Sequence, residues 1–171
     1  KLWKEMGIEH EKKHFKLLKD KYKKNIAIKS DLDEKRRFNE TIRAMKKGYD
    51  LIYHAYLVDG DLRGEADFLI KCDTPSDLGD YSYEVYDTKI TRNLRSRHVT
   101  QITAYSDMLG KIQKLLPKKM YLIDGSDLKH SFKTTEYIDL FNHGKKEFIK
   151  FLSNIDKEKI YPEKCSYCNL C

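Results

Sequence analysis

The chain has 171 residues, of which 40% are hydrophobic and 36% are charged, so it can bury the core of one domain of ordinary size. No apolar run approaches the ~20 residues that a membrane-spanning helix needs, and the first residues, KLWKEMGIEHEKKHF, are too charged for a secretory signal. A net charge of +7 favours a polyanionic partner, although a solvated, lysine-rich surface explains the same excess. We therefore expect a cytoplasmic protein with no membrane partner.

Two helices are predicted in the first third of the chain. Residues 2–24 form an amphipathic helix, with lysines on its outer faces. Its inward positions recur at four- and three-residue steps and are Trp3, Gly7, His10, His14 and Leu17. A second helix begins near Ser30, which Asp33 follows three residues later, and Gly48 ends it.

Three β-strands are predicted in the middle of the chain. Residues 51–58 (LIYHAYLV) are rich in β formers, Asp59-Gly60 supplies a tight turn, and residues 62–71 form the partner strand of a hairpin. A polar loop follows. Residues 81–90 (YSYEVYDTKI) are then expected to form a third strand.

Two helices and two short strands are predicted in the rest of the chain. A basic loop, TRNLRSR, leads into a helix from about residue 97 to 116, which Pro117 ends, and a strand follows at 120–123. A weaker strand near 130–134 and a helix across 135–153 precede a tail that carries three cysteines. The fold class expected from these elements is α/β, with a central mixed sheet flanked by helices.

Two carboxylates and one lysine are expected to meet where the predicted strands pair. Asp67 lies on one strand, and Asp87 and Lys89, two residues apart, share a face of the next. Carboxylates hold Mg²⁺ or Mn²⁺, the Thr88 carbonyl is a plausible further ligand, and an ammonium group can polarise a water molecule. A D-x-K pattern alone is weak, because such residues more often form a solvated strand edge.

The order of four short motifs strengthens this hypothesis. They are G-x-x-H (Gly7, His10), G-x-x-D (Gly64, Asp67), Y-E-V-Y-D-T-K (83–89) and Q-x-x-x-Y (Gln101, Tyr105). With these motifs the chain resembles, over essentially its whole length, the RecB-like branch of the PD-(D/E)XK nuclease superfamily. Within that branch it is similar to prokaryotic nucleases related to the CRISPR-associated adaptation nucleases.

The resemblance implies a restriction-endonuclease-like core. It also implies that the protein is a metal-dependent, exonuclease-like deoxyribonuclease that acts in DNA repair, recombination or defence. It implies Mg²⁺ or Mn²⁺ at His10, Asp67, Asp87 and the Thr88 carbonyl, with Lys89 as the catalytic lysine. Gln101 and Tyr105 match a helix motif that abuts the site and the DNA strand. The implied partners are DNA, single-stranded or with free ends, and a fused or associated helicase.

The tail also resembles those nucleases, in which cysteines hold a [4Fe-4S] cluster. Cys165, Cys168 and Cys171 are spaced C-x2-C-x2-C, but a cluster needs four thiolates and no cysteine precedes His10. Cys72 is either the fourth ligand or a buried free cysteine, and zinc or a metal-free end are the alternatives to iron and sulfur. We therefore divide the chain into a nuclease domain, residues 1–160, and a cysteine-rich segment, residues 161–171.

The sequence allows a second interpretation of several of these candidate site residues. His10 on an inward helix face is commonly a hydrogen-bonded core histidine, and His14 competes with it for a role in the site. Tyr105 could be a core residue of its helix. Glu65 is as well explained by an ion pair with Arg63 or Lys71 as by a role at the metal. Two rival functions are a non-catalytic nucleic-acid-binding module that keeps the fold, and a structural domain in which the cysteines matter most.

Overall fold

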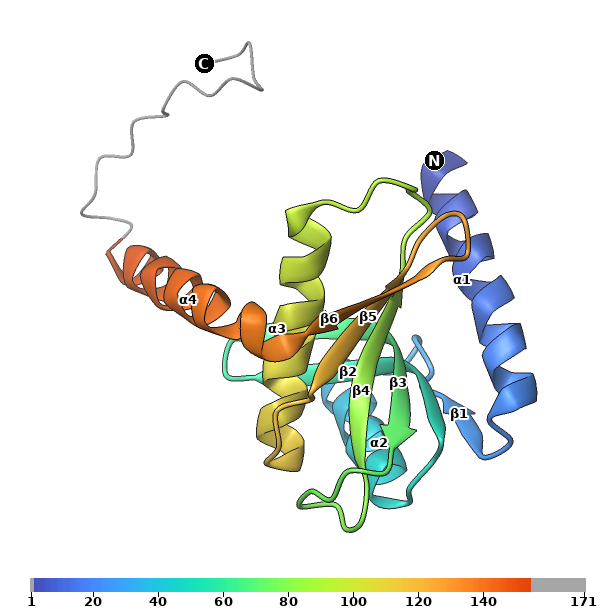
Figure 1. Cartoon of the computed structure of the whole chain (residues 1–171). Helices are drawn as coiled ribbons and strands as arrows, with labels where there is room; N and C mark the ends of the chain where they lie inside the picture. Colours follow the sequence, from blue (N-terminus) through green and yellow to red (C-terminus); the bar gives the residue numbers. More distant parts are fainter. Residues whose placement is uncertain (1, 155–171) are drawn as a thin grey trace.

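The computed structural model describes residues 2–154, which form one six-stranded sheet with helices on both faces (Figure 1). The helices are α1 (Leu2–Lys21), α2 (Glu34–Lys46), α3 (Ser96–Gln113), the short 3₁₀ helix η1 (Thr134–Glu136) and α4 (Ile138–Ser153). The strands are β1 (Asn25–Ala27), β2 (Leu51–Asp59), β3 (Leu62–Cys72), β4 (Ser82–Thr88), β5 (Lys119–Ile123) and β6 (Lys129–Lys133).

The sheet is mixed and its strands follow the order of the chain, β1-β2-β3-β4-β5-β6. The pairs β1/β2 and β4/β5 are parallel, and the remaining pairs are antiparallel. Each parallel pair is joined by a helical connection, α2 in the first case and α3 in the second, as parallel strands require. The predicted α/β class with a mixed, helix-flanked sheet is therefore confirmed. The three-residue β1 was not predicted.

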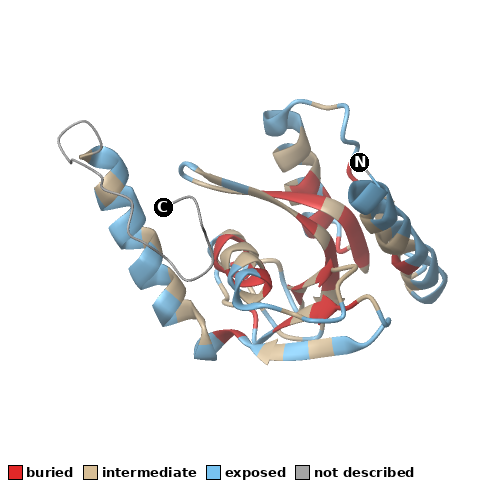
Figure 2. Cartoon of the chain, turned by 90° about the horizontal axis from the view of Figure 1, so that it is seen from above, coloured by how far each residue is buried: buried red, intermediate tan, exposed pale blue. Residues whose placement is uncertain are grey.

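The helices cover the sheet in layers. Side chains of α2 and α3 join the larger apolar core, together with residues of β2 to β5. On the other face, Phe15 and Leu18 of α1 pack on a smaller cluster formed by Leu51, Tyr53, Phe68 and Ile70. Figure 2 shows buried residues concentrated in the sheet and in the helix surfaces that face it, while the outer surfaces of α1 and α4 are exposed.

The inward face of α1 agrees only in part with the predicted one: the side chains of His10 and His14 are 12% and 8% exposed, as expected of inward positions. Trp3 and Leu17 were expected to face the sheet, yet they are 72% and 57% exposed. Phe15 instead stacks on Tyr53 with 4.0 Å between ring centroids. The helix is therefore rotated, so that the stripe containing Glu11 and Phe15 meets β2. The reason is that α1 carries few apolar side chains, and the aromatic surface of the sheet selects which of them are buried.

Two local predictions are also wrong by a few residues. The second helix starts at Glu34, because Asp33 and not Ser30 caps it: the Arg36 amide donates to the Asp33 carboxylate at 2.9 Å. In the hairpin, Asp59 still pairs with Leu62, so the turn is Gly60-Asp61. Gly60 adopts a φ of 58°, a conformation that glycine permits at this position of a two-residue turn.

The pleat of the hairpin changes phase at His54. Tyr53 belongs to the cluster under α1, but Ala55, two residues later, belongs to the opposite core. In a regular strand both side chains would lie on the same face. His54 lies between them with a φ of 56°, in the left-handed region. The strand is thus irregular at this residue, which lies, like Asp67 of β3, between the paired positions Tyr53/Phe68 and Ala55/Ala66.

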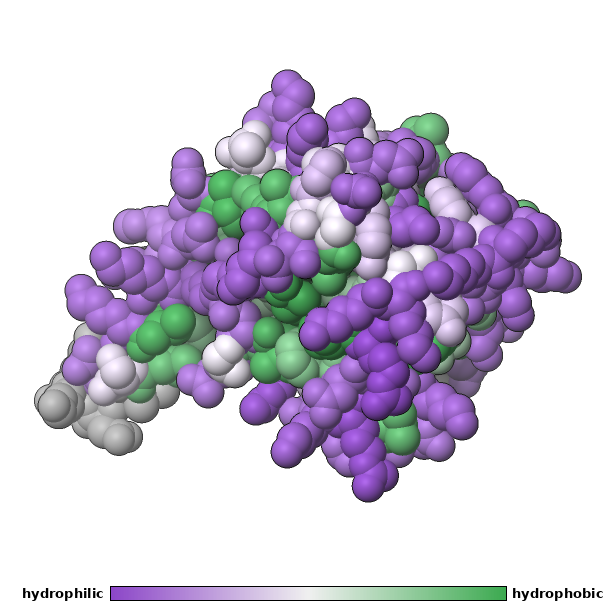
Figure 3. All heavy atoms as spheres, turned by 90° about the horizontal axis from the view of Figure 1, so that it is seen from below, coloured by the Kyte–Doolittle hydropathy of each residue, from purple (hydrophilic) through white to green (hydrophobic). Residues whose placement is uncertain are grey.

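Helix α4 is joined to the domain by a cluster of charged side chains. Lys145 donates to Asp59 at 2.7 Å and to Asp107 at 3.2 Å, and Lys111 of α3 joins the same two carboxylates. Seen from below, the surface is mostly hydrophilic, with apolar side chains in limited patches (Figure 3). Within residues 2–154, no helix combines the length and apolar character required to cross a membrane. The boundary at residue 160, and Cys165, Cys168 and Cys171, lie outside the described residues.

Candidate metal centre

Asp67 and Asp87 are brought together by the pairing of β3 with β4. Phe68 lies opposite Tyr86 in this register, so the next position places Asp67 opposite Asp87. Both the amide and the hydroxyl of Thr88 donate to one Asp67 oxygen, at 2.7 Å and 2.6 Å. Asp87 is 1% exposed. The two carboxylates therefore occupy a fixed position at the end of the central strand pair.

Lys89 lies immediately beyond the end of β4 and forms an ion pair with Asp87. Its backbone amide donates to the Ile123 carbonyl at 2.8 Å, so β5 fixes the chain at this residue. The Lys89 side chain is 19% exposed and thus stays within reach of solvent. The structure brings together the three residues singled out from the sequence, Asp67, Asp87 and Lys89.

In the metal-free protein, simultaneous ionisation of the Asp67 and Asp87 carboxyl groups is unfavourable. Burial, the charge of Asp87 and the charge of Glu11 raise the pKa of Asp67 to about 8, although hydrogen bonds from Thr88 oppose the rise. Burial also raises the pKa of Asp87, with Lys89 acting in the opposite direction and Glu11 adding to the rise. Carboxylates that repel one another in a dry site are the arrangement that a divalent cation stabilises.

The stability of the metal-free protein should therefore fall as pH rises from about 5 to 8, relative to that of Asp67→Asn. The folded chain keeps a proton on Asp67 that the unfolded chain has lost above its ordinary pKa of 3.8. Each pH unit then costs up to about 1.4 kcal/mol. Thermal unfolding of both proteins across this range measures the difference, and identical slopes would contradict the raised pKa. Millimolar Mn²⁺ should reverse the trend if the centre holds a divalent cation, because such an ion would bind the deprotonated pair.

Glu11 is an acidic residue of this centre that the sequence analysis missed. It projects from α1 toward β2, where His54 is hydrogen-bonded to it, and its charge acts on both Asp67 and Asp87. Burial acts to raise the pKa of Glu11, but hydrogen bonds from His54 and Tyr53 and the charge of Lys89 hold it below its ordinary value. Glu11 and Phe15, four residues apart, share one face of α1, but the sequence does not show that this face meets β2.

His10 lies beside His14 and Asp127 in the structure. The His10 Nδ1 atom is 3.9 Å from an Asp127 oxygen, to which His14 Nε2 is hydrogen-bonded at 2.9 Å. Ligand atoms of these three residues lie within 4.8 Å of one another, so the group could hold a metal ion itself. Within the described part of the chain, no hydrogen bond or ion pair joins His10 to Asp67 or Asp87.

One atom of His10 fits the expected role of a metal ligand. Its Nε2 is buried and has no hydrogen-bond partner among residues 2–154. A ligating histidine commonly directs its second ring nitrogen to a carboxylate, and Asp127 lies on that side. An unpaired imidazole nitrogen beside a carboxylate is therefore compatible with metal binding, as are the oxygen donors of Asp67, Asp87 and Thr88.

Gln101 and Tyr105 face the centre from α3. The Gln101 amide donates to the Tyr105 hydroxyl at 2.7 Å. Burial raises the pKa of Tyr105, the hydrogen bond from Gln101 opposes the rise, and the charges of Asp87 and Asp67 add to it. The ring lies over Gly64 of β3, where a Cβ atom would come within 2.4 Å of it. Tyr105 is therefore both packed and close to the carboxylates.

Other residues considered from the sequence have different partners. Glu65 pairs with Arg37 of α2, not with Arg63 or Lys71. Cys72 is a half-buried free cysteine whose sulfur lies 3.1 Å from the Ser82 hydroxyl. Its proposed link to the tail concerns residues outside those described.

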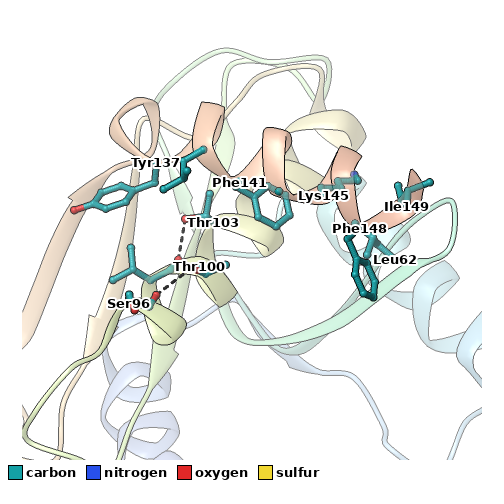
Figure 4. Close-up of a pocket in the computed structure, with 12 residues that line it drawn as sticks. Leu62, Ser96, Thr100, Thr103, Tyr137, Phe141, Lys145, Phe148 and Ile149 are labelled. Atoms are coloured by element: carbon teal, nitrogen blue, oxygen red, sulfur yellow. Dashed lines mark hydrogen bonds between the residues drawn. The ribbon is translucent and has the colours of Figure 1, made fainter. Parts of the chain in front are cut away.

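A separate apolar groove of about 460 Å³ lies between α3 and α4. Figure 4 shows Phe141 and Phe148 of α4 directed toward α3 and Leu62, while Thr100 and Thr103 line the α3 side. The carboxylates and Lys89 are not among its lining residues, which include no acidic side chain. The groove is thus distinct from the candidate metal centre.

Comparison with protein-family models gives no match for this chain, and no curated protein matches it either.

Proposed function

We propose that this chain is a metal-dependent deoxyribonuclease with a restriction-endonuclease-like fold of the RecB-like PD-(D/E)XK kind. The observation that carries the proposal is the pairing of β3 with β4, which brings the half-buried Asp67 beside the buried Asp87 and its ion-pair partner Lys89. Two carboxylates that are costly to ionise without a cation, with an ammonium group beside them, suit hydrolysis of a phosphodiester. An exonuclease-like activity in DNA repair, recombination or defence is the corresponding proposal for its role.

Asp67, Asp87, the Thr88 carbonyl and His10 Nε2 are the donors that would hold Mg²⁺ or Mn²⁺. When bound, the ion would lower the pKa of a coordinated water and offset charge on the phosphate. A histidine donor favours Mn²⁺ among these ions. The Thr88 amide and hydroxyl orient Asp67, and Asp127 lies where it can orient the His10 ring.

Lys89 would position the attacking water and stabilise charge on the phosphate, because its ammonium group is compact and partly exposed beside Asp87. Gln101 and Tyr105 would contact the DNA strand next to the site. The net charge of +7 supports a polyanionic substrate held largely through its phosphates. A DNA substrate that is single-stranded or has free ends, and a fused or associated helicase, are part of the proposal.

A [4Fe-4S] cluster at Cys165, Cys168 and Cys171 remains a proposal for the intact protein, with zinc as the alternative metal. These cysteines lie outside the described residues. Iron and zinc content of purified protein, measured by elemental analysis, distinguishes the two metals.

The test is cleavage of end-labelled single- and double-stranded DNA with Mn²⁺, with Mg²⁺ and with a chelator. We expect cutting with either ion, none with chelator, and release of short products from ends. Cutting that persists in chelator would contradict a metal-dependent reaction. A folded protein that binds the same DNA without cutting it under any of these conditions would instead favour the non-catalytic binding module.

A further inference from the structure

The backbone of β2 is distorted beside Asp67 of β3. Tyr53 pairs with Phe68, and Ala55 pairs with Ala66, so His54 and Asp67 occupy the position between these pairs. His54 adopts a φ of 56°, a backbone conformation that residues other than glycine rarely take within a strand. Such distortions persist where surrounding contacts impose them, and they concentrate at functional sites. The contacts of His54 therefore indicate what the distortion achieves.

The His54 ring is fixed on three sides. Its Nε2 is hydrogen-bonded to Glu11 of α1, and its Nδ1 lies 3.8 Å from Glu65 of β3. The ring stacks on Tyr53 with 3.8 Å between centroids. Glu65 is itself held by Arg37 of α2. The left-handed backbone thus directs an imidazole to the Glu11 carboxylate and holds it there.

The Glu11 carboxylate is consequently fixed by a residue of β2 that lies beside Asp67 of β3. Lys89, which forms an ion pair with Asp87, supplies a positive charge at the same centre. When ionised, Glu11, Asp67 and Asp87 carry three negative charges, and Lys89 carries one positive charge. Two negative charges remain, which a single divalent cation would neutralise. Without a cation, a third carboxylate here only adds repulsion between like charges.

We propose that Glu11 is a third carboxylate of the divalent-cation site and that His54 is the residue that positions it. The inference rests on the proposed metal centre, but it concerns residues that none of the sequence motifs include. His54 acts through Glu11 and touches neither the ion nor the substrate, so it sets metal affinity. At saturating metal its replacement leaves the maximal cleavage rate nearly unchanged.

Binding of Mn²⁺ to the full chain tests this directly, with free Mn²⁺ followed by electron paramagnetic resonance. Glu11→Gln removes the charge at constant size. His54→Asn keeps a residue that accepts the left-handed conformation, but its side chain is too short to hold Glu11. Glu9→Gln, on an exposed position of the same helix, is the matched control. Asp87→Asn serves as the reference for loss of the centre, and thermal unfolding establishes that each variant is folded.

We expect Glu11→Gln to raise the dissociation constant for Mn²⁺ about 10- to 100-fold, His54→Asn to raise it about 10-fold, and Glu9→Gln to leave it unchanged. Cleavage by His54→Asn should recover as Mn²⁺ is raised. Unchanged affinity in Glu11→Gln, together with lost affinity in Asp87→Asn, would overturn the inference and leave the metal centre standing. Unchanged affinity in Asp87→Asn would overturn the metal centre itself. Unchanged affinity in His54→Asn alone would remove the positioning role.

Discussion

Asp87→Asn is expected to lower metal-dependent DNA cleavage by about 10³-fold or more while raising the melting temperature of the metal-free protein. The loss follows because Asp87 is both a proposed metal ligand and the partner of Lys89. The gain in stability follows because burial and the Glu11 charge disfavour the ionised carboxylate, so a neutral amide of the same size relieves the repulsion. Single-turnover cleavage and thermal unfolding in chelator measure the two effects.

Lys89→Met should lower the cleavage rate about 10²- to 10³-fold with little change in DNA binding. Lys71→Met is the matched control, because it removes a comparable ion pair, with Asp50, at the other end of β3. A rate that falls equally in both variants would show that the Lys89 effect is structural. Asp87→Asn with near-normal cleavage would contradict the proposed centre.

Gly125→Ala is expected to destabilise the fold by about 2–4 kcal/mol and to impair cleavage, although residue 125 bears no functional group. A Cβ atom there would lie 2.1 Å from the Ile90 carbonyl oxygen and 2.7 Å from its carbonyl carbon. These are backbone atoms of the residue after Lys89, and the Gly125 amide also donates to Thr91 at 3.1 Å. The β5–β6 loop would have to move away from the segment that carries Lys89.

Gly144→Ala provides the control for this substitution. Gly144 lies within α4, and no atom lies within 4 Å of a Cβ built at this position. Alanine should therefore stabilise the helix by up to about 1 kcal/mol and leave cleavage unchanged. Urea unfolding of both variants gives the comparison. A Gly125→Ala protein as stable as the parent would mean that the loop has room that the structure does not show.

The parts of the fold that could be predicted from sequence are those specified by neighbouring residues. The hairpin and β4 were predicted to within a few residues, because turn chemistry and runs of β formers are local signals. Strand β1 was missed, since three residues give no periodicity. Helix α1 was predicted in extent but not in rotation, because the aromatic surface that it meets is formed by residues about 40 positions later.

The same distinction applies to the candidate site. Asp67, Asp87 and Lys89 could be placed together from strand pairing alone, since antiparallel register brings successive strands into contact. Glu11 and His54 could not, because one depends on how α1 docks and the other on a left-handed residue inside a strand. No run of letters signals either condition. His10 and His14 were placed together on α1 as expected, yet their companion Asp127 comes from packing of the helix against the β5–β6 loop.

Helix α1 buries little of its surface against the sheet, and this affects the stability of the candidate centre. This helix buries only His14 fully, yet it supplies both His10 and Glu11. A helix attached by so few buried side chains opens locally at a small fraction of the cost of global unfolding. Each opening would remove an imidazole and a carboxylate from the vicinity of Asp67 and Asp87 while leaving the sheet intact. If a cation binds at the proposed centre, docking of α1 and occupancy of the centre would form one linked equilibrium. The cation would close the helix onto the sheet, and undocking of the helix would release the cation.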